Sequence, residues 1–236
     1  MLLTLNQLDT SDDESYLKLK EDFYFFPTGD NSKERHELQI KSEQRINDIV
    51  MSHRYVVEVY NHNRKHYDPV YKEFNEHNLN MLDDISEEHK HLFRMSFPNY
   101  NWKEEIEQVK VIANESLIIN LWVTIEQFTN RTLKLINPDA KSSYYWNDLK
   151  NDFFSKGVDF TSINSYENIN ELRVVNNKLK HMYFVDEQLA KFNNFKDSEG
   201  KSLNSVSFNL QDYITSSYHF LYTLINSVGE TIYYPK

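Results

Sequence analysis

Backbone breaks are rare in this chain, and their rarity is what most constrains the fold. The 236 residues contain only four glycines and five prolines, so few positions force the backbone out of a regular helix. Between these breaks, apolar residues recur at intervals of three and four, the spacing of one face of an α-helix. We therefore expect an all-α protein, a helical bundle of about four long helices with short extra helices.

The segments with helical spacing have recognisable ends. The expected long helices cover roughly 34–67, 101–136, 166–181 and 210–229. Asp68-Pro69 predicts the end of the first helix, Asn101 is a candidate cap for the second, and Gly229 predicts the end of the last. Alternating apolar and polar residues near 192–208 predict a small β-ribbon.

The organisation around these helices is that of a single helical domain over residues 1–236. Residues 1–33 are polar and acidic, and we expect them to form a peripheral N-terminal segment. Residues 68–101 are acidic and rich in histidine, which predicts an insertion between the first two long helices. Packing within a short helix is expected for two aromatic runs, Tyr144-Tyr145-Trp146 and Phe153-Phe154.

Charge and composition narrow the range of functions. The formal charge of −10 argues against a broad nucleic-acid-binding surface, since phosphate contacts need clustered lysine and arginine, but it leaves room for a small positive site. The absence of cysteine excludes disulfides, thiol catalysis and thiolate metal sites. No apolar run approaches the ~20 residues of a membrane-spanning helix, and the first residues lack the pattern of a signal peptide. We expect a cytoplasmic protein without membrane contact.

One helical stretch, residues 171–183, places polar and apolar side chains on different sides. Arg173, Asn177 and His181 are spaced i, i+4 and i+8, so on a helix they form one polar line about 12 Å long. A second arc is expected to face the core and contains Leu172, Val175, Leu179 and Met182. Val174 and Val185 fall on the side of the polar line, where they suit an interface.

The same stretch resembles the motif helix of the HEPN superfamily, whose usual pattern is arginine, four to six residues, then histidine. Asparagine often follows the arginine, and tyrosine sometimes stands two residues after the histidine. Here Asn177 matches the asparagine, His181 the histidine and Tyr183 the trailing tyrosine. Asn176 stands where arginine is usual, and Arg173 is the nearest upstream arginine. The resemblance implies a helical bundle and, as in many members, metal-independent ribonuclease activity.

The first hypothesis is accordingly an endoribonuclease that needs no metal or other cofactor, acting as a toxin or defence effector on RNA. Histidine is the side chain best suited to proton transfer near neutral pH, so His181 is the candidate to take a proton from a ribose 2′-hydroxyl. The permanent charge of Arg173 suits a phosphate. Asn177 can hydrogen bond to the phosphate or the imidazole. Lys178 and Lys180 add local positive charge.

Two more side chains and the oligomeric state belong to this hypothesis. Glu126, at the edge of the apolar surface of the second long helix, is either a solvated boundary carboxylate or a group that orients Arg173 or His181. A glutamate at this place also resembles many HEPN sequences. Tyr183 is expected to pack, with its hydroxyl hydrogen bonded. A two-fold homodimer with two facing motif helices would bring both polar lines to one cleft.

Three alternatives stay open. The polar line fits a solvated helix face whose Lys180-His181 end is favoured by the helix dipole. It also fits a non-catalytic module that binds a nucleotide, RNA or a partner protein, and an antitoxin or partner subunit is compatible with either function. A metal hydrolase is the third alternative, and it depends on the i, i+4 pair His62 and His66. The favoured explanation of this pair is a solvated helix end.

His53 is expected to be a core histidine hydrogen bonded to a neighbour.

Overall fold

The computed structural model describes residues 2–8, 17, 19, 31–74, 86–95 and 98–233. These residues form an all-α architecture with one small β-ribbon, which confirms the predicted fold class. The elements, in chain order, are β1 (Leu3–Thr4), α1 (Ser32–Phe74), α2 (Glu87–Met95), α3 (Pro98–Ile136), α4 (Trp146–Ser155), η3 (Phe160–Ser162), α5 (Tyr166–His181), η4 (Leu189–Lys191), η5 (Asn193–Phe195), η6 (Leu203–Ser205), β2 (Ser207–Phe208) and α6 (Leu210–Tyr233).

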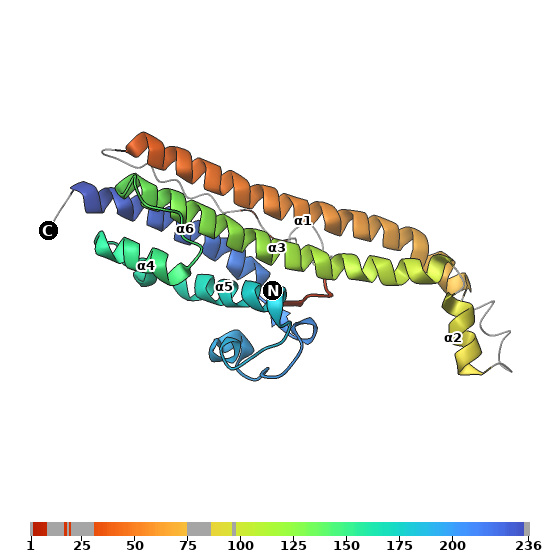
Figure 1. Ribbon diagram of the computed structural model, residues 1–236. Helices are drawn as coiled ribbons and strands as arrows, with labels where there is room; N and C mark the ends of the chain where they lie inside the picture. The colour runs from red at the N-terminus through yellow and green to blue at the C-terminus, as the bar shows by residue number, and fades with distance from the viewer. Residues whose placement is uncertain are drawn as a thin grey trace.

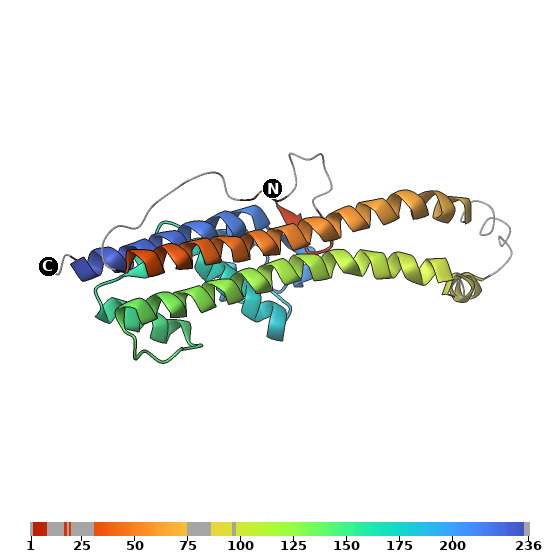
Figure 2. The ribbon, with the colours of Figure 1, turned by 90° about the horizontal axis from the view of Figure 1, so that it is seen from above.

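Three helices, α1, α3 and α6, run side by side along the molecule (Figures 1 and 2). α1 and α3 extend past the end of α6 as a two-helix arm, and α2 lies at the far end of that arm. α4 and α5 pack against the bundle, α4 on α3 and α5 on both α3 and α6 (Figure 1). This arrangement places α5, the helix with the polar line, on the body of the bundle, away from the arm.

The core consists of the apolar positions that recur at helical spacing. It joins α1 and α3 to α5 and α6 through buried side chains that include Ile46, Val50, Ile118, Leu121, Ile125, Leu172, Val175, Leu221 and Leu224. An aromatic group holds α4 in place: the ring of Trp146 lies 5.0 Å from Trp122, 5.1 Å from Phe160 and 6.1 Å from Phe220, centre to centre. Such contacts fix both the position and the orientation of a short helix.

Two predicted helix boundaries on the arm are wrong. α1 continues through Pro69 to Phe74, although a proline inside a helix loses a backbone hydrogen bond at a cost of about 3 kcal/mol. α3 begins at Pro98, so Asn101 lies inside its first turn instead of capping it. Proline is favourable at a first helical position because its missing N–H would be unpaired there in any case.

The end of α6 and the ribbon also differ in detail from prediction. α6 passes through Gly229, since glycine permits the left-handed conformation that ends helices but does not impose it. β2 pairs in antiparallel fashion with β1, Leu3 opposite Phe208, so the ribbon joins residues near the N-terminus to those just before α6, and not two parts of 192–208.

The expected surrounding segments are described in part. Leu3, Leu5, Leu8 and Leu17 of segment 1–33 are buried and contribute to the apolar core, whereas Leu2 is 57 % exposed. The predicted insertion at 68–101 contains α2, and its residues 75–85, 96 and 97 lie outside the described residues. Among the helices that the structure describes, none combines the length and apolar character needed to cross a membrane.

Candidate functional site

Helix α5, which contains the polar line, is buried on more than one side. Leu172 and Val175 face the core as predicted, and Leu179 packs against it, but Met182 is 46 % exposed. Val174 and Val185, predicted for an interface, are fully buried in the core. The reason is that α5 is covered by α3, by α6 and by the segment that follows it, so two flanks of the helix are enclosed.

A local feature ends α5 at His181. Tyr183 adopts a left-handed conformation with φ of 58°, and its amide donates to the carbonyl of Lys178 at 2.8 Å. Glycine usually supplies this turn, and here tyrosine does so because its side chain is held. Its hydroxyl donates to the Glu115 carboxylate and lies 2.8 Å from Oδ1 of Asn204. The prediction of a packed tyrosine with a hydrogen-bonded hydroxyl is confirmed.

The outward flank of α5 lines a pocket of about 660 Å³. Four segments meet there: α3, the start of α4 with the residues before it, α5, and the chain leading into η4. The lining residues are Trp122, Glu126, Tyr144, Tyr145, Trp146, Asn147, Asp148, Arg173, Asn177 and Gln188. The structure therefore brings Arg173, Asn177 and Glu126 of the predicted site together in one hollow.

Arg173 is half-buried in this pocket without a counter-ion. Its Nε and Nη2 atoms donate to Oδ1 of Asn170 at 3.1 and 2.9 Å, which fixes the guanidinium plane. In the part of the chain that the structure describes, no carboxylate lies within ion-pair distance of it, although Glu126 and Asp148 line the same pocket. Burial lowers the pKa of Arg173, the sign of a cation that is partly desolvated and uncompensated.

Glu126 is the second charged group that partial burial perturbs. Burial raises the pKa of its carboxyl, while the positive charge of Lys180 and a hydrogen bond from Trp122 act in the opposite direction. The charge of Lys180 on α5 therefore acts on the Glu126 carboxyl. No hydrogen bond joins Glu126 to Arg173 or His181 among the described side chains.

His181 lies apart from Arg173 and Asn177. It is the last residue of α5, it is exposed, and it is not among the residues that line the pocket. One helical turn beyond Asn177 corresponds to about 6 Å along the axis. The polar line therefore divides into a pocket part, Arg173 and Asn177, and an open end, His181.

The remaining residues of the predicted site have structural contacts. Lys178 is buried, and its Nζ lies 2.6 Å from Oδ2 of Asp186, so its charge is neutralised within the fold. Burial alone would raise the pKa of Asp186, but the hydrogen bonds from Lys178 and from the Leu189 amide outweigh it and lower that pKa. Lys180 is exposed. Asn176 is only 1 % exposed, so at this position an arginine would point into the bundle.

Sequence reasoning missed Glu171, a buried acid in the middle of the motif. Its Oε1 accepts from the Tyr213 hydroxyl at 2.6 Å and from Nδ2 of Asn194 at 2.8 Å. Burial raises the pKa of this carboxyl, and the two hydrogen bonds oppose that effect. The carboxylate joins α5 to α6 and to η5. The sequence did contain a signal for it: a charged residue, Glu171, lies next to Leu172 on the side of the helix expected to face the core.

The aromatic runs are divided between core and surface. Trp146 and Phe153 are buried as expected, but Tyr144 is 86 % exposed, Tyr145 74 % and Phe154 68 %. The packing prediction is wrong for these three. Nothing in the sequence distinguishes Tyr145 from Trp146, because which of them faces inward depends on where α4 docks.

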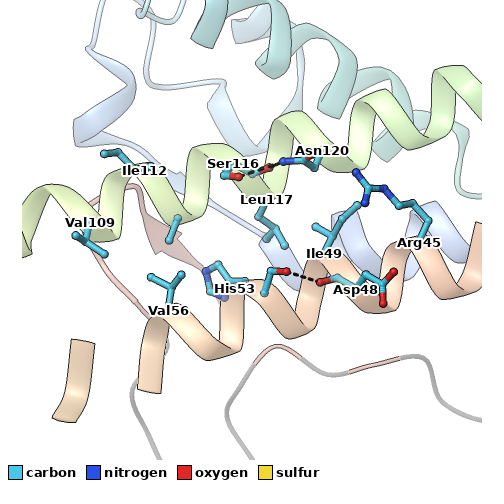
Figure 3. A pocket seen from close by; sticks show the side chains of 12 residues that line it. Arg45, Asp48, Ile49, His53, Val56, Val109, Ile112, Ser116, Leu117 and Asn120 are labelled. Atoms are coloured by element: carbon cyan, nitrogen blue, oxygen red, sulfur yellow. Dashed lines mark hydrogen bonds between the residues drawn. The ribbon is translucent and has the colours of Figure 1, made fainter. Parts of the chain in front are cut away.

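A second hollow, of about 340 Å³, lies between α1 and α3 (Figure 3). Its walls include Ile49, Val56, Val109 and Ile112, and His53 lies at its side. Nε2 of His53 is 2.7 Å from Oδ1 of the buried Asn114, which confirms the predicted core histidine. Among the described residues, no three histidine, cysteine or acidic side chains lie together so that they could hold a metal, and His62 is exposed.

Fold and site together define an all-α bundle with a polar pocket along α5. Comparison with known proteins finds no match, neither to a protein-family model, nor to a curated sequence, nor to a solved structure.

Proposed function

We propose that this protein is a metal-independent endoribonuclease of the HEPN type, acting on RNA as a toxin or an antiviral defence effector. The observation that carries the proposal is the half-buried guanidinium of Arg173, which has no carboxylate partner among the described residues and shares its pocket with Asn177. A partly desolvated cation without a counter-ion is unfavourable until an anion binds. Arginine matches the geometry of a phosphate, which would supply that anion.

The chemistry assigns one step to each side chain. His181 takes the proton of a ribose 2′-hydroxyl, the freed oxygen forms a bond to the adjacent phosphorus, and the bond to the 5′-oxygen breaks as that oxygen takes up a proton. Arg173 stabilises the extra negative charge on the phosphate, and Asn177 donates a hydrogen bond to it. The products are a 2′,3′-cyclic phosphate and a 5′-hydroxyl end.

A homodimer through α5 is part of the proposal. His181 lies outside the pocket of its own chain, so a second copy facing α5 would bring another imidazole toward it. Met182 is 46 % and Phe184 39 % exposed next to His181, and these apolar side chains take the place of the buried Val174 and Val185 as interface candidates. A monomer by light scattering at micromolar concentration would contradict this arrangement.

The second candidate is a non-catalytic module on the same scaffold, which binds RNA, a nucleotide or a partner protein such as an antitoxin. The separation of His181 from the pocket favours it, because a binding site needs only Arg173 and Asn177. The negative formal charge of the chain also suits a small site better than an extended one.

An RNA cleavage assay with purified full-length protein in EDTA separates the two candidates. For the nuclease, His181→Ala should reduce the rate by ~10²-fold or more, and Arg173→Ala by a similar factor. The matched control is His91→Ala, an exposed histidine on the distant α2. RNA ends carrying 2′,3′-cyclic phosphate support the enzyme. Binding of RNA without cleavage supports the module, and a wild type that neither binds nor cleaves RNA overturns the enzyme and the RNA-binding form of the module.

A further inference from the structure

Two adjacent tyrosines stand at the rim of the pocket with their rings in solvent. Tyr144 and Tyr145 are 86 % and 74 % exposed, and both line the pocket that contains Arg173. Single exposed apolar side chains are common on proteins, but neighbouring aromatic rings beside a cation at a hollow are a feature of binding surfaces. Because they lie in the same pocket as Arg173, the side chain assigned to phosphate, these rings suit a ligand that has a flat apolar part next to its anionic group.

The segment carrying the tyrosines is held firmly. Asn130 of α3 donates through Nδ2 to the Ser143 carbonyl at 3.0 Å, and its Oδ1 accepts from the Ser143 amide at 2.9 Å. The Tyr145 amide then donates to Oγ of Ser143 at 3.0 Å. These bonds fix the backbone on both sides of Tyr144, so little conformational freedom of the backbone is lost when a ligand stacks there.

The polar groups of the pocket complete a site suited to nucleotides. Three amide side chains, from Asn147, Asn177 and Gln188, can each donate and accept hydrogen bonds, as the edges of bases require. The carboxylates of Glu126 and Asp148 disfavour a phosphate in their part of the pocket but can accept from an exocyclic amino group. A volume of about 660 Å³ is within the range of small-molecule sites.

We propose that Tyr144 and Tyr145 form a stacking platform for an unpaired base, whose neighbouring phosphate binds Arg173. The substrate class is therefore single-stranded RNA, because a base within a duplex is already stacked on both faces and cannot reach the tyrosines. This inference rests on the proposed function, in that it takes the anion at Arg173 to be an RNA phosphate.

The test measures the binding of a labelled RNA by fluorescence anisotropy, using full-length protein carrying His181→Ala so that the RNA stays intact. Tyr144→Ala and Tyr145→Ala should each weaken the binding of a single-stranded oligonucleotide by roughly 5- to 100-fold, whereas phenylalanine at either position should retain it. A duplex of the same sequence should bind more weakly than the single strand. The matched control is Tyr55→Ala, a tyrosine 69 % exposed on α1 and outside the pocket.

The outcomes distinguish this inference from the function on which it rests. Loss of binding with Arg173→Ala but unchanged binding with both tyrosine-to-alanine variants would overturn the platform and leave the phosphate site intact. Equal affinity for the single strand and the duplex would do the same. Absence of RNA binding by the protein with both tyrosines and Arg173 present would overturn both proposals. Because both tyrosines are exposed, the variants should fold, which thermal unfolding by circular dichroism checks.

Discussion

Replacing Tyr213 with phenylalanine tests how the fold holds the motif helix. The Tyr213 side chain is 1 % exposed on α6, and its hydroxyl donates to the Glu171 carboxylate of α5 at 2.6 Å. The same oxygen accepts from Asn194, which remains in the variant. A hydrogen bond to a charged group contributes about 1.5–3 kcal/mol to the free energy of unfolding, and one to a neutral group about 0.5–1.5 kcal/mol. Tyr213→Phe should therefore destabilise by about 2 kcal/mol near neutral pH.

The pH dependence of this loss follows from the pKa of Glu171. Burial raises that pKa, so the stability linked to the protonated carboxyl is present below its ordinary value and is lost as pH rises through the folded-state value. The Tyr213 hydrogen bond lowers the pKa of Glu171. Without it the folded-state pKa rises further. The cost of Tyr213→Phe should therefore be small in acid, where Glu171 is neutral, and should grow as the carboxyl ionises.

Urea unfolding followed by circular dichroism, at about pH 4 and about pH 7, measures both quantities. Tyr218→Phe is the matched control, because Tyr218 is also buried on α6 but its hydroxyl donates to the neutral Oδ1 of Asn47. The control should lose about 1 kcal/mol at both pH values. Equal losses for Tyr213→Phe at the two pH values, or a loss at neutral pH no larger than that of the control, would refute the reasoning.

Two further substitutions test features of the helices. Asp186→Asn leaves the buried Lys178 ammonium without its ion pair and should destabilise by about 1–3 kcal/mol in urea unfolding. The lowered pKa of Asp186 means that this difference persists above its ordinary pKa and vanishes only as pH falls through the folded-state value, so a difference that disappears at neutral pH would contradict it. Pro69→Ala restores a backbone donor inside α1 and should stabilise the helix there by up to ~3 kcal/mol. Amide hydrogen exchange of this part of α1 should slow. Unchanged or faster exchange would show that Pro69 does not destabilise the helix.

The local pattern of the sequence predicted the helices well, because helix formation depends on the spacing of neighbouring residues. Apolar repeats placed the long helices, although Pro69 and Gly229, expected at helix ends, lie inside α1 and α6. Gly157, with φ of 81°, follows the end of α4 as a left-handed glycine. The i, i+4 spacing of Arg173 and Asn177 also predicted that they would face one site, since four residues make little more than one turn. The local stop signal at Pro69 did not end α1, which continues to Phe74.

Contacts between distant segments decided the rest. The sequence alone determined that this chain is helical and that one helix carries a line of guanidinium, amide and imidazole groups. Only the tertiary structure decided that Val174 is enclosed while Tyr144 and Tyr145 stand in solvent, and that the pocket takes in Arg173 and leaves His181 outside. The physical reason is that periodicity fixes the direction of a side chain relative to its own helix axis. Whether that side of the helix faces solvent or the core depends on which segment, distant in the sequence, packs against it.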